Sequence, residues 1–270
     1  MNAIRRAQLA TVVRLELKKN FFRLCGLWVY LLAFAPAFII LMHGIFDRAD
    51  SHDDDTQVLA VIFQMYYLRV GIFIGCLGIF TRLFRGDVME RSLHYYFLAP
   101  IRREVLVLGK WLAGATAASF VFGLGVMTSF LILYLHQRDG MAFLTSAQGV
   151  KHFWAYLGVT VLATLGYGSL FLLTGMLFRN PIIPAVVIGS WEAANHILPN
   201  LLKKFSVIFY LEPLCPVEMP AERGLIGLFM LPADPLPPWL AVTGLLAFCA
   251  LVLAYTAYKI REVEISYGTD

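Results

Sequence analysis

Charge is scarce in this sequence: only 15% of its 270 residues are Asp, Glu, Lys or Arg, while 59% are apolar. Soluble domains carry about 25% charged and about 45–50% apolar residues. The mean hydropathy of +0.71 agrees with this imbalance. These values exclude an ordinary soluble domain and indicate that lipid surrounds much of the surface. The formal net charge of +4 is too small to indicate a nucleic-acid partner.

Motifs for metal binding and for ATP binding are also missing. The four cysteines form no C-x-x-C pair, so we expect neither a metal site nor a redox motif. No phosphate-binding loop occurs, because Gly109-Lys110-Trp111 lacks the upstream glycine and the following hydroxyl. We therefore expect no catalytic residues and no cofactor bound directly by this chain.

Long apolar runs dominate what is present. A helix needs about 20 apolar residues to cross a bilayer core of about 30 Å, and six runs of 20 to 26 residues qualify. None shows the alternation of a barrel strand. The sequence therefore predicts an all-α integral membrane protein with six transmembrane helices. The predicted spans are Leu24–Phe46, Val58–Phe80, Trp111–Leu135, Phe153–Phe178, Pro181–Leu202 and Trp239–Tyr258.

The distribution of Lys and Arg predicts the orientation of these spans. If the N-terminus is cytoplasmic, the inner segments hold fifteen of the 22 basic residues and the outer segments hold six. This bias predicts a multi-pass protein of the cytoplasmic membrane with both termini inside. We expect one transmembrane domain over residues 1–270. Its three main non-spanning segments are an interfacial helix (1–23), an inner loop (82–104) and an outer, re-entrant segment (203–238).

Residues 1–23 have the pattern of a basic amphipathic helix. Leu9, Val13, Leu17 and Phe21 recur four residues apart, while Arg14 and Lys18 lie on the other side of the helical wheel. This pattern predicts a helix lying in the cytoplasmic interface of the bilayer. The alternative is a basic flank that sets only topology.

The inner loop combines charges with aromatic residues. Ser92 to Leu98 is compatible with a helix, and Pro100 ends it because the residue before a proline disfavours the helical region. Tyr95, Tyr96 and Phe97 give this short helix a surface suited to docking on another protein. The alternative is a solvated loop with interfacial aromatics.

Polar residues inside the predicted spans are candidates for a pathway. Charged groups in a bilayer are costly unless paired or hydrated, and Arg69 and Glu192 lie within spans two and five. They could pair with each other, or Glu192, Asn195 and His196 could line a polar cavity, since Glu192 and His196 are four residues apart. The alternatives are a structural ion pair and a fifth span shorter than drawn, with Glu192 near the outer interface. Gly71, Gly75 and Gly78 form a small-residue seam for internal packing or for dimerisation.

The inner loop resembles the signature of the ABC-2 type permeases, the membrane subunits of type V ABC exporters. The counterparts in this chain are Asp87 to Arg91, Ser92-Leu93, Tyr95 to Phe97, Ala99 to Arg103 and Gly109-Lys110. The six spans, cytoplasmic termini, basic interfacial helix and long outer segment also match that family. The resemblance implies an ATPase-coupling surface made of Glu90, Arg91, Ser92, Leu93, His94, Tyr95, Tyr96, Phe97, Pro100, Arg102 and Arg103.

The same resemblance implies the partners and the activity. ATP and Mg²⁺ would be bound by separate ABC ATPase subunits, and a second permease subunit, identical or related, would complete the pathway. The expected activity is export of an amphipathic or lipid-like substrate. One alternative is a mechanical or assembly subunit that acts on a periplasmic partner without moving cargo. Another is an intramembrane enzyme using Glu192 and His196, although no nucleophile or metal-ligand set accompanies them.

Overall fold

The computed structural model describes residues 3–24, 26–46, 52–89, 98, 101–135, 140–196, 198–217 and 236–262. These residues are almost entirely helical, and no strand occurs among them. The long helices are α1 (Ala3–Leu24), α2 (Leu27–Phe46), α4 (Ile72–Met89), α6 (Arg103–Leu135), α8 (Ala147–Leu177) and α13 (Pro238–Lys259). The shorter elements are α3 (His52–Val61), η1 (Ile62–Gly71), α7 (Gly140–Thr145), α9 (Ile182–Ala193), η2 (Ala194–His196), α10 (Asn200–Lys203), α11 (Val207–Leu211) and η3 (Glu212–Leu214).

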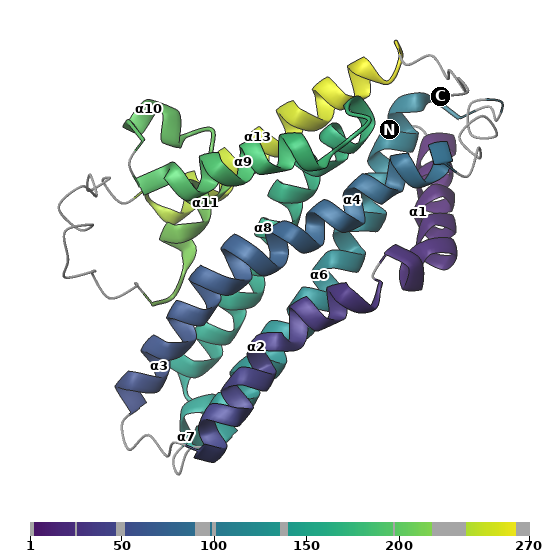
Figure 1. The fold of residues 1–270 in the computed structure, drawn as a ribbon. Helices are drawn as coiled ribbons and strands as arrows, with labels where there is room; N and C mark the ends of the chain where they lie inside the picture. Colours follow the sequence, from purple (N-terminus) through teal and green to yellow (C-terminus); the bar gives the residue numbers. More distant parts are fainter. Residues whose placement is uncertain are drawn as a thin grey trace.

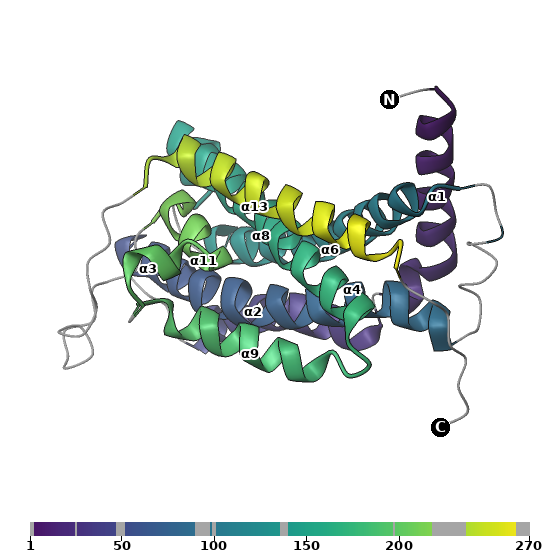
Figure 2. The same cartoon turned by 90° about the horizontal axis from the view of Figure 1, so that it is seen from above.

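The long helices form an elongated bundle, and α1 lies across one end of it. Figure 1 shows α2, α3–α4, α6, α8 and α13 running along the bundle, and Figure 2 shows α1 nearly perpendicular to them. The main helix contacts are between α4 and α8, α2 and α6, α1 and α6, and α6 and α8. The end of the bundle that α1 covers also holds the end of α4, the start of α6 and the end of α13 (Figure 2).

Four helices are long and apolar enough to cross a membrane: Thr56–Asp87, Arg103–Leu135, Ala147–Leu177 and Pro238–Lys259. They correspond to the predicted spans two, three, four and six. The first of them joins α3, η1 and α4 without a break, and its middle, Ile62–Gly71, is π-helical. Helical conformation extends past each apolar run into charged residues such as Asp87 and Arg103, which hydropathy counts as loop.

The other two predicted spans are shorter in the structure. Helix α2 covers Leu27–Phe46 of the predicted Leu24–Phe46, and α9 covers only Ile182–Ala193. At 1.5 Å per residue, the twelve residues of α9 extend about 18 Å, less than the hydrocarbon thickness of about 30 Å. The predicted span Pro181–Leu202 is therefore not one helix, because the chain turns through η2 and α10 after Ala193.

Glycines let the helices of the bundle approach closely. A Cβ atom at Gly75 would lie 2.3 Å from the Phe122 ring, and one at Gly78 would lie 2.1 Å from the Trp28 ring. The Gly71–Gly78 seam therefore packs inside this chain, which settles the choice left open by the sequence. Gly168 receives Phe80 of α4 in the same manner. Such contacts replace the hydrophobic effect as the force that joins helices in lipid.

The described part of the predicted outer segment folds back onto the bundle. Val207, Ile208 and Leu211 of α11 are fully buried, and α11 packs on α8 and α13. Gly244 of α13 leaves room for the Tyr210 ring. Residues 218–235, which include the predicted re-entrant stretch, lie outside the described residues.

Candidate functional site

A buried lysine joins three helices at the end of the bundle that α1 covers. Lys110 Nζ donates hydrogen bonds to Glu16 Oε1 of α1 at 2.6 Å, Asp87 Oδ2 of α4 at 2.5 Å and the Leu83 carbonyl at 2.8 Å. The side chains of Lys110, Glu16 and Asp87 are 0%, 0% and 4% exposed. The Phe84 ring also lies below the ammonium group, with its centroid 5.6 Å away. We call Glu16, Asp87 and Lys110 the charge cluster.

The local sequence around Lys110 explains why α1 docks there. A Cβ atom at Gly109 would lie 2.5 Å from Val12 Cγ1, so the glycine provides the space into which α1 packs. Val12 and Glu16 are four residues apart and therefore lie on the same face of α1. Both are fully buried. Gly109 and Lys110 together form a seat for α1, with the glycine providing the close approach and the lysine the ionic contact.

Glu16 adds a buried contact to the interfacial helix that the sequence analysis did not include. Leu9, Val13 and Leu17, the predicted apolar stripe, are only half-buried, whereas Val12 and Glu16 form the buried centre of α1. The sequence alone did not single out Glu16. The feature that could have indicated it is a lone acidic residue, one turn after Val12, in an otherwise basic helix. Arg14 and Lys18 are exposed as predicted, and the side chain of Phe21 lies outside the described residues.

A second set of contacts joins the start of α6 to the end of α13. Arg103 Nη1 donates to the carbonyls of Ile260 and Arg261 at 3.1 and 2.9 Å, and Arg261 pairs with Glu104. The Arg102 carbonyl accepts from the backbone N–H groups of Val105 and Leu106, which begins the helix. Of the predicted coupling residues, Arg102 therefore begins α6 through its backbone carbonyl, and Arg103 joins the start of α6 to the end of α13.

The rest of the predicted coupling surface cannot be placed. Glu90, Arg91, Ser92, Leu93, His94, Tyr95, Tyr96, Phe97 and Pro100 lie outside the described residues. Leu98 is described and is 80% exposed. The segment that carries these residues connects Met89, the last residue of α4, to Arg103, the first residue of α6. It therefore leaves from the helix of Asp87 and enters the helix of Lys110.

Arg69 pairs with Glu212, and not with Glu192. Arg69 Nη2 lies 2.7 Å from Glu212 Oε1, and the two side chains are 19% and 28% exposed. This contact joins the π-helical part of the long helix to η3. The sequence left open a pair between Arg69 and Glu192. The partner of Arg69 is instead Glu212, which lies outside the predicted spans.

Glu192 caps the short helix α11. Its carboxylate accepts from the backbone N–H groups of Val207 and Ile208 at 2.8 and 3.0 Å and from the Ser206 hydroxyl at 2.8 Å. The Tyr167 hydroxyl donates to it at 3.4 Å. Helix N-termini have free N–H groups and favour a negative charge. The buried carboxylate is therefore satisfied by structural contacts.

Glu192 and His196 do not share one α-helical face. The α-helix ends at Ala193, and residues Ala194–His196 form a 3₁₀ turn. A spacing of four residues therefore no longer places the two side chains on one face. Asn195 is buried, and the His196 side chain lies outside the described residues. In the part of the chain that the structure describes, no group of three His, Cys, Asp or Glu side chains could hold a metal ion.

Beyond η3, the Cys215 thiol is held in its neutral form. It donates to the Leu211 carbonyl at 3.6 Å. Burial, with the nearby Glu212 carboxylate, raises the pKa of Cys215 to about 12.

No family model matches this chain, and no curated protein matches it. The class that the fold defines is a helical protein with four helices long and apolar enough to cross a membrane, consistent with a multi-pass membrane protein.

Proposed function

We propose that this chain is the permease subunit of an ATP-binding cassette exporter of the ABC-2 type. The ATPase is a separate subunit that binds ATP and Mg²⁺ and docks on residues 90–100. A second permease subunit faces this one, and an amphipathic or lipid-like substrate passes outward between them. The protein crosses the cytoplasmic membrane six times, with both termini in the cytoplasm.

The observation that carries this proposal is the charge cluster. Asp87 lies three residues before the proposed docking segment and Lys110 lies ten residues after it. Lys110 binds both Asp87 of α4 and Glu16 of the interfacial helix. A force applied to residues 90–100 therefore acts on α1, α4 and α6 together, which is what an ATPase-coupled permease requires.

The chain path supports six crossings. Helix α9, the short elements after it and α11 fill the position of a fifth crossing between α8 and α13, although α9 itself spans only part of the bilayer. A helix interrupted at membrane depth is tolerated where protein covers it, and α11 is buried. The interruption gives the proposed pathway an element that can move without breaking a continuous helix.

Co-purification with an ATPase tests this proposal. The full chain is tagged and purified in mild detergent from its native membrane, and vanadate-sensitive ATP hydrolysis is measured. A Tyr96→Asp/Phe97→Asp variant removes the proposed docking surface. We expect a near-stoichiometric ATPase with the wild-type chain and its loss with this variant.

Met141→Asp provides the matched control, because Met141 is an exposed apolar residue at the opposite end of the bundle. This control variant should retain the ATPase. If the wild-type chain purifies as a folded protein without any ATPase, or if both variants lose the ATPase equally, the proposed coupling surface is wrong.

A further inference from the structure

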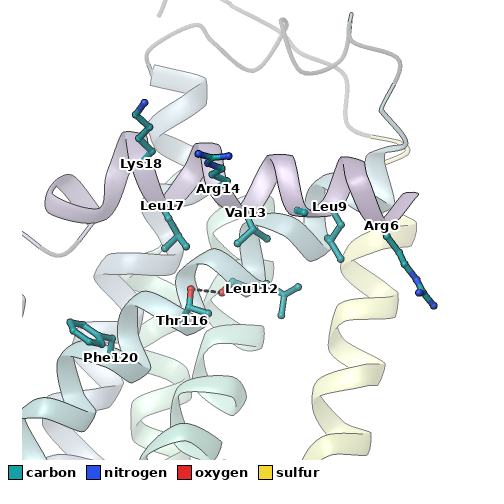
Figure 3. A pocket seen from close by; sticks show the side chains of 10 residues that line it. Arg6, Leu9, Val13, Arg14, Leu17, Lys18, Leu112, Thr116 and Phe120 are labelled. Carbon is teal, nitrogen blue, oxygen red and sulfur yellow. Dashed lines mark hydrogen bonds between the residues drawn. The ribbon is translucent and has the colours of Figure 1, made fainter. Parts of the chain in front are cut away.

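We propose that a groove between α1 and α6 binds one anionic phospholipid of the leaflet in which α1 lies. The groove has a volume of about 1030 Å³. Its apolar wall is formed by Leu9, Val13, Leu17, Leu112, Thr116 and Phe120. Figure 3 shows the three α1 side chains directed toward the three residues of α6. This inference requires a bilayer but no ATPase, so it goes beyond the proposed function.

The wall of the groove fits an acyl chain. The Thr116 hydroxyl donates to the carbonyls of Leu112 and Ala113 within its own helix, both at 2.9 Å, so its proton is already used. From Arg6 to Lys18 the groove follows α1 for about 18 Å at 1.5 Å per residue. An acyl chain is about 15 Å long when extended, since two of them fill the bilayer core of about 30 Å. Because α1 lies across the bundle, one chain would lie along α1 within the groove. A single acyl chain therefore matches both the chemistry and the length of the groove.

The groove opens toward lipid. Phe120 is 57% exposed, and it belongs to α6, a helix long and apolar enough to cross a membrane. Leu108, also on α6, is exposed as well. A lipid can therefore enter the groove laterally from the bilayer through its open side.

The charges around the groove select the headgroup. Arg6, Arg14 and Lys18 contribute to its lining, which holds no acidic residue among those described. In Figure 3, Arg14 and Lys18 extend on the side of α1 away from α6, and Arg6 extends from the N-terminal part of the helix. Long basic side chains cover apolar surface with their stems while their charged ends stay in the polar layer. Three cations beside one apolar groove are complementary to a lipid phosphate with a negative net charge.

Lipid retention measured by native mass spectrometry tests this site. The full chain in detergent is titrated with dioleoyl phosphatidylglycerol or with dioleoyl phosphatidylcholine, which have identical chains and different net charges. We expect one tightly held phosphatidylglycerol per chain, with a preference over phosphatidylcholine of about tenfold or more from three nearby cations. Glycerol 1-phosphate, which has no acyl chain, should not displace the bound lipid.

Two variants separate the headgroup from the chain. Arg6→Ala/Arg14→Ala/Lys18→Ala should remove the preference while leaving weak binding of both lipids, since all three side chains are exposed. Ala10→Trp, which places a large ring in the groove, should reduce retention of both lipids. The control Lys151→Ala/Arg179→Ala/Lys204→Ala removes three exposed cations elsewhere and should leave the preference intact.

Three results would overturn the site. Equal retention of the two lipids by the wild-type chain would show that the cations select nothing. Loss of the preference in the control variant would show a general charge effect. A photo-crosslinker at Val13 that captures polypeptide from a second copy, and no lipid, would assign the groove to a protein contact instead.

Discussion

Lys110 is one buried cation held by two buried carboxylates. Removing one partner of a buried ion pair leaves an uncompensated charge in a poorly solvated site and costs about 3–5 kcal/mol. We expect Lys110→Met to lower the free energy of unfolding by about that amount, because Glu16 and Asp87 then lie buried without their ammonium partner. The measurement is thermal unfolding in detergent, followed by circular dichroism.

Two comparison variants assign this loss to charge. Lys151→Met removes an exposed lysine and should change stability by about 0.5 kcal/mol or less. Adding Glu16→Gln and Asp87→Asn to Lys110→Met should recover part of the loss, since neutral amides cost less to bury than carboxylates. A Lys110→Met protein as stable as wild type would refute the role of the cluster.

The Cys215 thiol supplies a pH-dependent prediction. A free thiol has a pKa of about 8.5, whereas that of Cys215 is about 12. Because the folded state favours the protonated thiol, the stability that this residue contributes is complete below about pH 8.5. It is lost as the pH rises toward 12.

The rate of alkylation also depends on the raised pKa of Cys215. At pH 8, iodoacetamide should modify Cys215 in the folded protein at least about a hundredfold more slowly than in detergent-denatured protein, because the reactive thiolate is rare. Mass spectrometry of the peptide containing Cys215 measures the rate. Glu212→Gln should accelerate the reaction, because the Glu212 carboxylate contributes to the raised pKa of Cys215. Equal rates in the folded and denatured states would contradict the prediction.

At the scale of elements, the close packing of α1 on α6 depends on Gly109. Gly109→Ala would bring a methyl group within 2.5 Å of Val12 Cγ1, so α1 must shift away from α6. We expect a loss of about 1–3 kcal/mol from overpacking, together with faster protease cleavage of α1. Limited proteolysis with mass spectrometry measures the second effect.

Gly158→Ala is the matched control, because no neighbouring atom lies within 4 Å of a Cβ atom added there. This control should stabilise α8 slightly, since alanine is favoured over glycine in a helix. Val12→Ala should partly rescue Gly109→Ala by removing the methyl groups that the new Cβ would meet. If Gly109→Ala behaves like Gly158→Ala, the seat for α1 is not formed as described.

The elements show which features the sequence could predict. The helices α6, α8 and α13 contain the predicted spans almost completely. A long apolar run without strand alternation satisfies its backbone hydrogen bonds in lipid only as a helix. The break after Ala193 could not be predicted, since it depends on Glu192 meeting the N–H groups of Val207 and Ile208. The π-helical segment 62–71 has no periodicity signal of its own.

The candidate site was predicted only in part, because the sequence does not show which residues meet in the tertiary fold. The interfacial helix, Arg69 and Glu192 could be found from composition and position, but their partners are set by the tertiary fold. Glu16 and Glu212 are ordinary acidic residues in the sequence. Only the docking of α1 on α6 and the ion pair between η3 and η1 give them a role.

At the scale of the whole molecule, two ionic contacts limit the number of membrane crossings. Glu16 of α1 contacts Lys110 near the start of α6, and Arg261 after α13 contacts Glu104 at the same start. The N-terminal helix and the end of α13 therefore lie at one end of the bundle (Figure 2). An even number of crossings satisfies this arrangement. If α2 joins the four long apolar helices as a crossing, the α9 region must supply a sixth, since five crossings would place the two ends on opposite sides.

Impermeant thiol labelling tests this topology in a variant lacking all four native cysteines. Arg14→Cys and Glu262→Cys place exposed thiols at the α1 end, and Met141→Cys places one at the other end. We expect the first two to react only in inside-out vesicles and the third only in right-side-out vesicles, because Lys and Arg concentrate on the cytoplasmic side. Labelling of Arg14→Cys and Glu262→Cys from opposite sides would be incompatible with the contact between Arg261 and Glu104. If the two react together but from the outside, an even number of crossings still holds and the predicted orientation is inverted.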